Sequence, residues 1–314
     1  MSEAEKTPLE IFEALEASRP GFIAIAPVKD DLLLGKSFEG ELVIGTESSP
    51  GAGTASFRTN RLDFIKSAAV LVYDGGGDER KLTLDLLKLR SSNEGHVRTL
   101  LNAVISNYDG GGLSSVLSIL VDLFSSPLTP SPEAVLGLWG ELRVILESDD
   151  PEFLINCWHQ NWSGLTDFQS TSGAVEVKTS LSVGGDLFVR KDFADSSQPL
   201  IILLVLAERS SEGQSVFDLR DNLAGKVSER ALAKVDRIFL QLTLGDDSLD
   251  CSQRYRLRLG DEALIGIFKD DLPTVREWDT GVSRIKYLVE NASQHGSLFG
   301  EEAISGITSV LLAP

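Results

Sequence analysis

The apolar run LIILLVLA, from Leu200 to Ala207, is the feature that most restricts how this chain folds. It is the longest apolar run in the chain and falls far short of the roughly 20 residues that a membrane-spanning helix needs. We therefore expect a buried strand here. A helical pattern at 132–147 and strand-like segments precede the run, and another helical pattern at about 217–236 and a strand-like RIFLQLTL follow it. This order predicts an α/β (α+β) fold whose core contains a mixed sheet.

The stretch GAVEVKTS, just before that run, is a second strand with an unusual distribution of charge. Val175, Val177 and their neighbours suit a pleated strand. Side chains alternate across a strand, so Glu176 and Lys178 share one face with Ala174, and the two valines share the other. An exposed ion pair on a solvent-facing edge strand would explain this pattern and would contribute little energy. A functional explanation needs further polar residues nearby.

An aspartate upstream supplies the first of these residues. Asp167 lies in GLTDFQS, and eight residues separate it from Glu176. That spacing allows a tight turn between neighbouring strands, which would place the two carboxylates side by side. Carboxylates this close repel each other unless a cation lies between them or one of them is protonated. Mg²⁺ prefers oxygen ligands of this kind, and Lys178 could then orient a water molecule and stabilise charge on a phosphate.

The helix predicted at 132–147 supplies a third carboxylate. Its residues Val135, Leu138, Trp139, Leu142, Ile145 and Leu146 form one apolar stripe at helical spacing. Glu141 falls at the border of this stripe, from which it could reach over the sheet edge toward a metal. Gly137 and Gly140 would let the helix pack closely on the sheet.

These residues together resemble the PD-(D/E)XK nuclease motif. The pattern is TD, eight residues, then EVK, with Thr166 where the family usually has proline. The wider arrangement GLWGEL, DF, VEVKTS and LIILLVL is similar to PD-(D/E)XK motif proteins of bacterial restriction and phage-defence loci. The resemblance implies a restriction-endonuclease-like core that cuts phosphodiester bonds with Mg²⁺ or Mn²⁺. It also implies that Asp167 and Glu176 are metal ligands, that Glu141 assists them and that Lys178 is catalytic.

Three other polar residues are weaker candidates for substrate contacts. Gln169 shares a strand face with Asp167, and Gln198 lies two residues before the buried strand. Arg190 forms a local basic pair with Lys191. Each has an ordinary alternative, because loop amides and hairpin ends are usually polar and solvated.

The net charge of −18 limits how the protein could act on DNA. A field of this sign repels nucleic acid and anionic membranes, so we expect no membrane association and no free-standing DNA-binding module. Two cysteines cannot build a disulfide framework, and the acidic start MSEAEKTPLEIFEAL does not resemble a signal peptide. These features favour a cytoplasmic location.

The chain length of 314 residues suggests about two domains, at roughly 100–200 residues each. Residues 1–127 contain strand-like runs followed by a helical pattern at 94–124, so we expect a β-rich N-terminal domain of unknown role. The proline-containing segment SSPLTPSPE, at 125–133, is the best linker candidate. Residues 132–250 would form the nuclease-like core, and 251–314 a C-terminal β/α extension.

Several other short motifs lack a residue that the corresponding binding site requires. LLLGKS ends like a phosphate-binding loop, but Asp30 stands where the first glycine is required. GAGTAS, at 51–56, lacks the third glycine of a dinucleotide-binding fingerprint. Cys157 and His159 have no second Cys/His pair at zinc-site spacing. Trp158 and Trp162 could stack on bases, but core packing is the simpler interpretation.

Three functional hypotheses follow. The first is an Mg²⁺-dependent DNA endonuclease of a restriction or phage-defence system, which relies for DNA targeting on partners such as an ATPase or a methyltransferase. The second is a non-catalytic subunit of a defence complex that keeps the nuclease fold. The third is an acidic DNA mimic or regulator. The sequence also admits a homo-oligomer.

Overall fold

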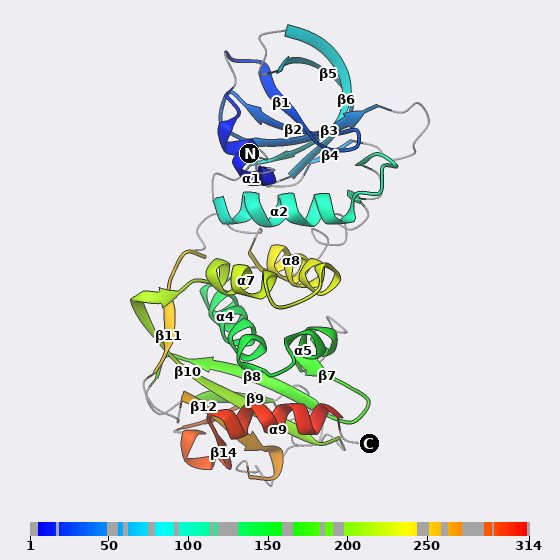
Figure 1. The fold of residues 1–314 in the computed structure, drawn as a ribbon. Helices are drawn as coiled ribbons and strands as arrows, with labels where there is room; N and C mark the ends of the chain where they lie inside the picture. The colour runs from blue at the N-terminus through cyan, green and yellow to red at the C-terminus, as the bar shows by residue number, and fades with distance from the viewer. Residues whose placement is uncertain are drawn as a thin grey trace, which may run out of the picture. The chain divides into compact units, whose positions relative to one another are not determined.

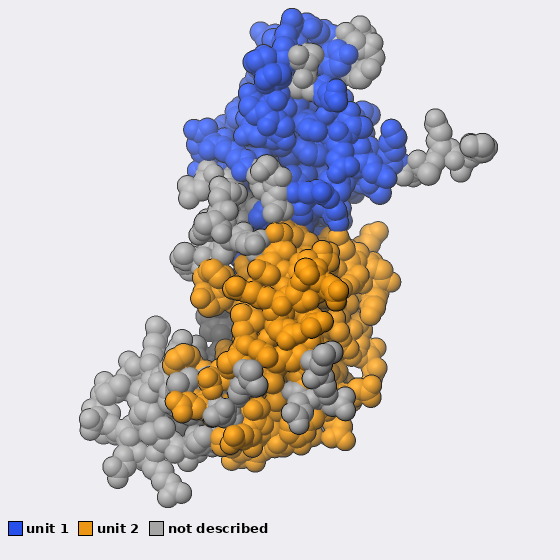
Figure 2. All heavy atoms as spheres, turned by 90° about the vertical axis from the view of Figure 1, so that its left-hand side faces the viewer, with its two compact units in different colours: residues 1–130, 233–247 blue, residues 131–232, 248–314 orange. Residues whose placement is uncertain are grey.

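The fold is taken from a computed structural model, which divides into two compact units (Figures 1 and 2). Unit 1 contains residues 1–130 and 233–247, and unit 2 contains residues 131–232 and 248–314. The structure describes residues 6–16, 19–48, 56–58, 62–74, 79–90, 94–113, 116–117, 131–158, 166–182, 186–190, 198–243, 251–258, 263–271, 286–290 and 292–312.

Unit 1 is built around a β-sheet that closes on itself. Helix α1 (Pro8–Ala14) precedes the sheet and helix α2 (Glu94–Asn107) follows it; the strands are β1 (Phe22–Lys29), β2 (Leu32–Ser37), β3 (Leu42–Glu47), β4 (Phe57–Arg58), β5 (Leu62–Asp74) and β6 (Glu79–Leu89). Their order is β1-β2-β3-β6-β5-β4, and β1 also pairs with β5 in parallel. This extra pairing removes the free edge that β1 would otherwise present.

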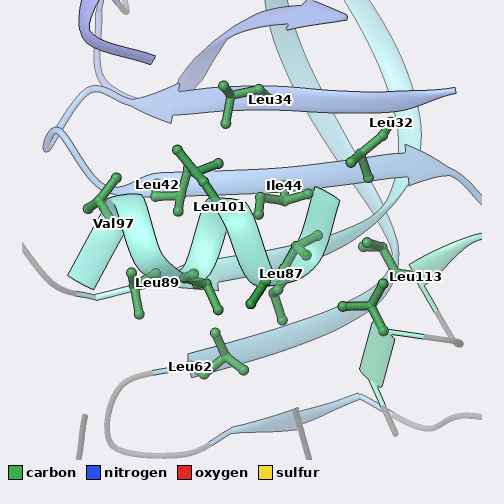
Figure 3. Packing of buried hydrophobic residues seen from close by; sticks show 14 of the residues in the cluster. Leu32, Leu34, Leu42, Ile44, Leu62, Leu87, Leu89, Val97, Leu101 and Leu113 are labelled. Carbon is green, nitrogen blue, oxygen red and sulfur yellow. The ribbon is translucent and has the colours of Figure 1, made fainter. Parts of the chain in front are cut away.

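Both faces of this sheet carry buried apolar residues, which belong to two separate clusters. Leu34, Leu42 and Ile44 lie on the face that packs against α2, where Val97 and Leu101 meet them (Figure 3). The alternate residues form a second buried cluster with one another: Ile25, Val43, Val72, Leu84 and Leu86. The period of two along each strand therefore fills both faces. The prediction of a β-rich N-terminal region is confirmed.

Helix α8 (Glu229–Thr243) begins in unit 2 and completes the core of unit 1. Leu240 belongs to the buried cluster of unit 1, and the Phe239 ring lies edge-on to His96 of α2. The prediction of a strand for RIFLQLTL was wrong. Ile238 and Phe239 favour strands locally, but Val235, Ile238 and Phe239 continue a helical apolar stripe that starts at Ala231, and all four are buried. The helical pattern at 217–236 is also divided, because α7 (Val216–Ala224) ends before α8 begins.

Unit 2 surrounds a mixed sheet. Its helices are α4 (Pro132–Glu147), α5 (Pro151–Cys157), α7 and α9 (Glu301–Leu312), with short 3-10 turns at Lys269–Asp271 and Ala292–His295; its strands are β7 (Phe168–Gln169), β8 (Ala174–Ser180), β9 (Leu187–Arg190), β10 (Leu200–Gln214), β11 (Tyr255–Leu257), β12 (Leu264–Phe268), β13 (Lys286–Val289) and β14 (Leu298–Phe299). The main sheet has the order β14-β12-β10-β8-β7, and β11 pairs with the far end of β10. A separate two-stranded sheet joins β9 and β13.

Strand β10 begins with the long apolar run from Leu200 to Ala207. It pairs in parallel with β8 and antiparallel with β12, so the predicted mixed α/β sheet is confirmed. All residues from Leu200 to Ala207 are buried, as the sequence predicted. In the described part of the chain, no helix combines the length and the apolar character needed to cross a membrane.

The packing of α8 in unit 1 gives a stability prediction. Leu240 is 1% exposed, so Leu240→Ala should lower the free energy of unfolding by about 2–5 kcal/mol, through lost burial and the cavity that it leaves. Urea denaturation followed by far-UV circular dichroism measures this loss. Leu312→Ala is the control, because Leu312 is 60% exposed and its loss should change stability by less than about 0.5 kcal/mol. Equal effects of the two substitutions would contradict the helical packing of 229–243.

Candidate active site

Helix α4 approaches the sheet at a glycine. The helix starts at Ser131, whose side chain caps the backbone N–H of Ala134 at 3.2 Å, with Pro132 in the first turn. A Cβ atom placed on Gly140 would lie 1.8 Å from Oγ1 of Thr179 in β8. The helix backbone therefore lies almost against the strand, and the predicted role of Gly140 in close packing is confirmed.

Glu141 follows this glycine and is more enclosed than its place at the stripe border predicted. It is 8% exposed, and its Oε2 accepts a hydrogen bond from Nε1 of Trp158 at 2.5 Å. Trp158 ends α5 and stacks on Phe168 of β7, with ring centroids 6.4 Å apart. Core packing is thus confirmed for Trp158, and its indole N–H fixes the Glu141 carboxylate. His159 and Trp162 lie outside the described residues.

Strands β7 and β8 bring the aspartate and the second glutamate together. Phe168 pairs with Val175 in antiparallel register, and extending that register by one residue places Asp167 opposite Glu176. The backbone N–H of Val177 donates to Oδ2 of Asp167 at 2.7 Å, which fixes the aspartate against β8. Ser170 N–H donates to the Gly173 carbonyl at 3.0 Å and closes the turn between the strands. The predicted adjacency of Asp167 and Glu176 is what this register produces.

The Glu176–Lys178 pair does not lie on a solvent-facing edge. Strand β8 lies between β7 and β10, and Glu176 is 6% exposed. Nζ of Lys178 donates to Oε1 of Glu176, and the Lys178 side chain is 35% exposed. The alternative of an exposed edge-strand ion pair is therefore wrong. A buried carboxylate of this kind needs a charged partner, and Lys178 supplies it.

The three carboxylates and the lysine act on one another electrostatically. Burial, followed by the negative charges of Glu141 and Glu176, raises the pKa of Asp167 well above its usual value, and Lys178 and the Val177 N–H offset only part of this. Burial alone would lower the pKa of Lys178, but Glu176, Asp167 and Glu141 outweigh it and raise that pKa. The group therefore concentrates negative charge around one ammonium that stays protonated at neutral pH. Sites with such perturbed groups are candidates for function.

The weaker candidates lie in three different places. Gln169 is half-buried in β7 and pairs with Ala174, while Gln198 is exposed just before β10. Arg190 lies in β9 and pairs with Lys286 of β13, in the sheet that is separate from β7 and β8. Their roles as substrate contacts stay predictions. Lys191 is outside the described residues.

Across the described residues, no group of three or more His, Cys, Asp or Glu side chains is arranged to hold a metal ion. The carboxylates of Glu141, Asp167 and Glu176 are instead directed at Trp158, Val177 and Lys178, respectively.

A surface cavity of about 450 Å³ lies elsewhere in unit 2. It is lined by Arg143, Glu147 and Asp149 after the Glu141 turn, by Leu257, Ala263 and Leu264, and by Gly300, Glu301, Ile304 and Ser305 at the start of α9. None of the three carboxylates or Lys178 lines it, so the cavity is separate from the charged group.

Residues 98–291 match the model of one family, described as "Putative PD-(D/E)XK family member, (DUF4420)". The matched range includes Glu141, Asp167, Glu176 and Lys178. No curated protein and no solved structure matches the chain.

The close approach at Gly140 should make this position intolerant of a side chain. Gly140→Ala forces the new Cβ against Thr179 and should destabilise the protein by about 1–3 kcal/mol. Thermal denaturation measures the change. Gly137→Ala is the matched control on the same helix, because its Cβ would lie at an ordinary 3.9 Å from Oε1 of Glu141 and alanine favours helices. A stable Gly140→Ala variant would contradict the helix–strand contact.

The raised pKa of Asp167 predicts that its charge costs stability. The folded protein holds the Asp167 proton more tightly than the unfolded chain does. As the pH rises above about 4, the ordinary pKa of an aspartate, the folded state therefore loses stability relative to the unfolded chain. Asp167→Asn keeps an acceptor for the Val177 N–H without the charge. In metal-free buffer it should therefore melt at a higher temperature than wild type at pH 7–8, and the difference should shrink as the pH falls toward about 4.

Asp63 provides a control of opposite sign in unit 1. Burial opposes its charge, but hydrogen bonds from Arg90 (2.5 Å) and Arg58 (3.1 Å) hold its pKa below the usual value. Asp63→Asn should therefore melt lower than wild type near neutral pH, and its deficit should shrink in acid. If Asp167→Asn also melts lower than wild type near neutral pH, burial and the neighbouring carboxylates do not raise the pKa of Asp167.

Proposed function

Because the chain belongs to this PD-(D/E)XK family, whose model covers more than half of the 314 residues, we propose that it is a divalent-metal-dependent endonuclease that hydrolyses DNA phosphodiester bonds. The observation that carries the proposal is the register between β7 and β8. When that register is extended by one residue, Asp167 lies opposite Glu176. Lys178 follows Glu176 by two residues on β8. A nuclease of this family type needs this set of groups at one point.

The carboxylate oxygens of this site suit a hard divalent cation. Among the described residues, however, no three His, Cys, Asp or Glu side chains are already arranged to hold a metal ion. Mg²⁺ is commonly bound through one or two carboxylates, with water and substrate phosphate completing its coordination. Asp167 and Glu176 are the pair that would hold it, and Glu141 adds negative charge nearby. Burial, followed by repulsion from Glu141 and Glu176, raises the pKa of Asp167, and a cation would stabilise the ionised carboxylate against both, which supports this fit. Bound there, Mg²⁺ or Mn²⁺ would polarise a phosphoryl oxygen and lower the pKa of a bound water molecule.

Lys178 would act through its charge and its N–H donors. Its raised pKa keeps it protonated at neutral pH, so it would not take a proton from water. Its 35% exposure leaves the ammonium accessible from solvent, where it can orient the attacking water and stabilise negative charge on the phosphate. Glu176, fixed by the same ammonium, would keep Lys178 in position.

The proposed setting is a bacterial restriction or phage-defence system. The net charge of −18 supports dependence on partners, because the field of the whole protein repels DNA. We infer that proteins such as an ATPase or a methyltransferase would deliver the DNA. The same charge favours a second candidate, a non-catalytic subunit of a defence complex that keeps the fold without the activity.

Plasmid cleavage tests the proposal directly. With Mg²⁺ or Mn²⁺, and with candidate partners added, wild type should nick or linearise DNA. Asp167→Ala, Glu176→Ala and Lys178→Ala should each lower the rate by about 10²-fold or more, because each removes a group that holds the metal or stabilises charge in the transition state. Glu208→Ala is the control, since Glu208 forms an exposed ion pair with Arg256 at the far end of β10.

The two candidate functions predict different outcomes of this assay. Chelation by EDTA should abolish cleavage and readdition of Mn²⁺ should restore it. Equal rates for wild type and the three variants would remove the assigned roles. No cleavage with any metal or partner, combined with stable binding to a partner, would favour the non-catalytic subunit.

A further inference from the structure

A row of residues across three strands brings an arginine toward the proposed catalytic face. Ser180 of β8 pairs with Leu206 of β10, and Ala207 pairs with Leu257 of β11. Arg258 N–H donates to the Leu206 carbonyl at 3.0 Å, which continues this register by one residue. Ser180, Leu206 and Arg258 therefore lie side by side. Because side chains alternate along a strand, the row falls on the face that carries Glu176 and Lys178.

The Arg258 side chain extends over β10 to the end of β8. Its Nη2 donates to the backbone carbonyl of Leu181, the residue that follows β8. Adjacent strands lie about 4.8 Å apart, so this contact spans two strand spacings, which is within the reach of an extended arginine. The guanidinium is thereby placed beside Ser180, two residues along the chain from Lys178.

This guanidinium has unused hydrogen-bonding capacity. Its Nε is buried and meets no acceptor among the described residues. An arginine carries five N–H donors, and a buried donor without an acceptor costs free energy comparable to a lost hydrogen bond. The contact with the Leu181 carbonyl uses only one of these five donors.

Hydroxyl groups adjoin the same point. The Oγ atoms of Ser180 and Ser182 are 3.1 Å apart, and the Ser182 N–H donates to the Ser180 Oγ at 3.2 Å. Two residues of strand separate the Cα atoms of Lys178 and Ser180 by about 6.7 Å. An ammonium, hydroxyl groups and a guanidinium thus follow one another along this face, away from the carboxylates.

We propose that Arg258 and Ser180 form an anion subsite that binds a backbone phosphate next to the phosphodiester facing Lys178. The inference rests on the proposed nuclease function, since it assigns the substrate contact of the same site. Arginine suits this role because its planar fork presents parallel N–H donors to a phosphate, and serine hydroxyls add a further donor. The subsite would supply local positive charge that the chain as a whole lacks.

The test measures DNA affinity in place of cleavage. Binding of a short fluorescein-labelled DNA duplex is followed by anisotropy, with Ca²⁺ replacing Mg²⁺, for wild type, Arg258→Gln and Arg256→Gln. Arg258→Gln removes the charge and, because glutamine is too short to span two strand spacings, also the donor to the Leu181 carbonyl. It should raise Kd about tenfold, as expected for one charge-assisted hydrogen bond, and reduce the slope of log K against log salt by about 0.9.

Arg256→Gln is the matched control for this measurement. The substitution removes the same charge two residues earlier in the chain, but the Arg256 Nε is already paired with Glu208 Oε1 at 2.6 Å. It should leave Kd and the salt slope unchanged. Ser180→Ala, which does not alter the Leu181 cap, should raise Kd severalfold without changing the salt slope, so the subsite stays testable if Arg258→Gln folds poorly. Equal Kd values for wild type, Arg258→Gln and Ser180→Ala would overturn the subsite.

A second readout separates the subsite from the proposed function. Inorganic pyrophosphate should raise the melting temperature of wild type and Arg256→Gln more than that of Arg258→Gln. If wild type cleaves DNA and Arg258→Gln binds it equally well, the subsite is wrong and the nuclease stands. If neither wild type nor any variant cleaves DNA, but pyrophosphate raises the melting temperature of wild type more than that of Arg258→Gln, the proposed nuclease activity is wrong and the anion subsite stands. Equal responses of all variants to pyrophosphate and to DNA overturn the subsite in either case.

Discussion

Lys178 is the positive charge that interacts with all three carboxylates of the candidate site, Glu141, Asp167 and Glu176. Glu141 and Glu176 are buried, and both raise the pKa of Asp167. Without a nearby cation, a cluster of this kind would protonate or separate, because desolvation and like-charge repulsion both penalise the ionised forms. One ammonium compensates part of this charge, and the raised pKa of Asp167 shows that part of the cost persists. Ionisable groups that are kept at such a cost cluster at functional sites.

The geometry of this cluster depends on backbone contacts more than on the acids themselves. Gly140 lets α4 lie against β8, and the helix then delivers Glu141 to the indole of Trp158. Trp158 in turn stacks on Phe168, the residue after Asp167. The aspartate is therefore held from two directions, by the aromatic stack beneath β7 and by the Val177 N–H of β8. A site assembled in this way is positioned by rigid elements, which is the usual requirement for groups that must meet within a fraction of an ångström.

The sequence was informative wherever a short-range pattern decided the structure. Alternation in GAVEVKTS predicted the face shared by Glu176 and Lys178, and the spacing to Asp167 predicted the β7–β8 adjacency. Prediction from the sequence failed where contacts between residues far apart in the chain determine the structure. RIFLQLTL has strand-forming residues, yet burial of Leu240 in the core of unit 1 requires the helical stripe. Helix α9 was not identified, although Ala303, Ile304, Ile307 and Leu311 recur at helical spacing and are buried. The enclosure of Glu141 depends on Trp158, which its position on a helical wheel could not show.

Arg258 illustrates the limit of motif-based inference from one sequence. It lies far along the chain from Lys178, and only the pairing of β11 with the far end of β10 places it in the row that ends at Ser180. No motif predicts that pairing, because register between distant strands is set by tertiary packing.

The net charge of −18 does not prevent a local contact between Arg258 and a phosphate. A global field governs encounter with DNA, whereas contacts within a few ångströms of a phosphate are governed by local groups and are screened less. An acidic protein can therefore hold a phosphate at one arginine while it repels DNA elsewhere, and such a protein gains most from a partner that brings the DNA to it.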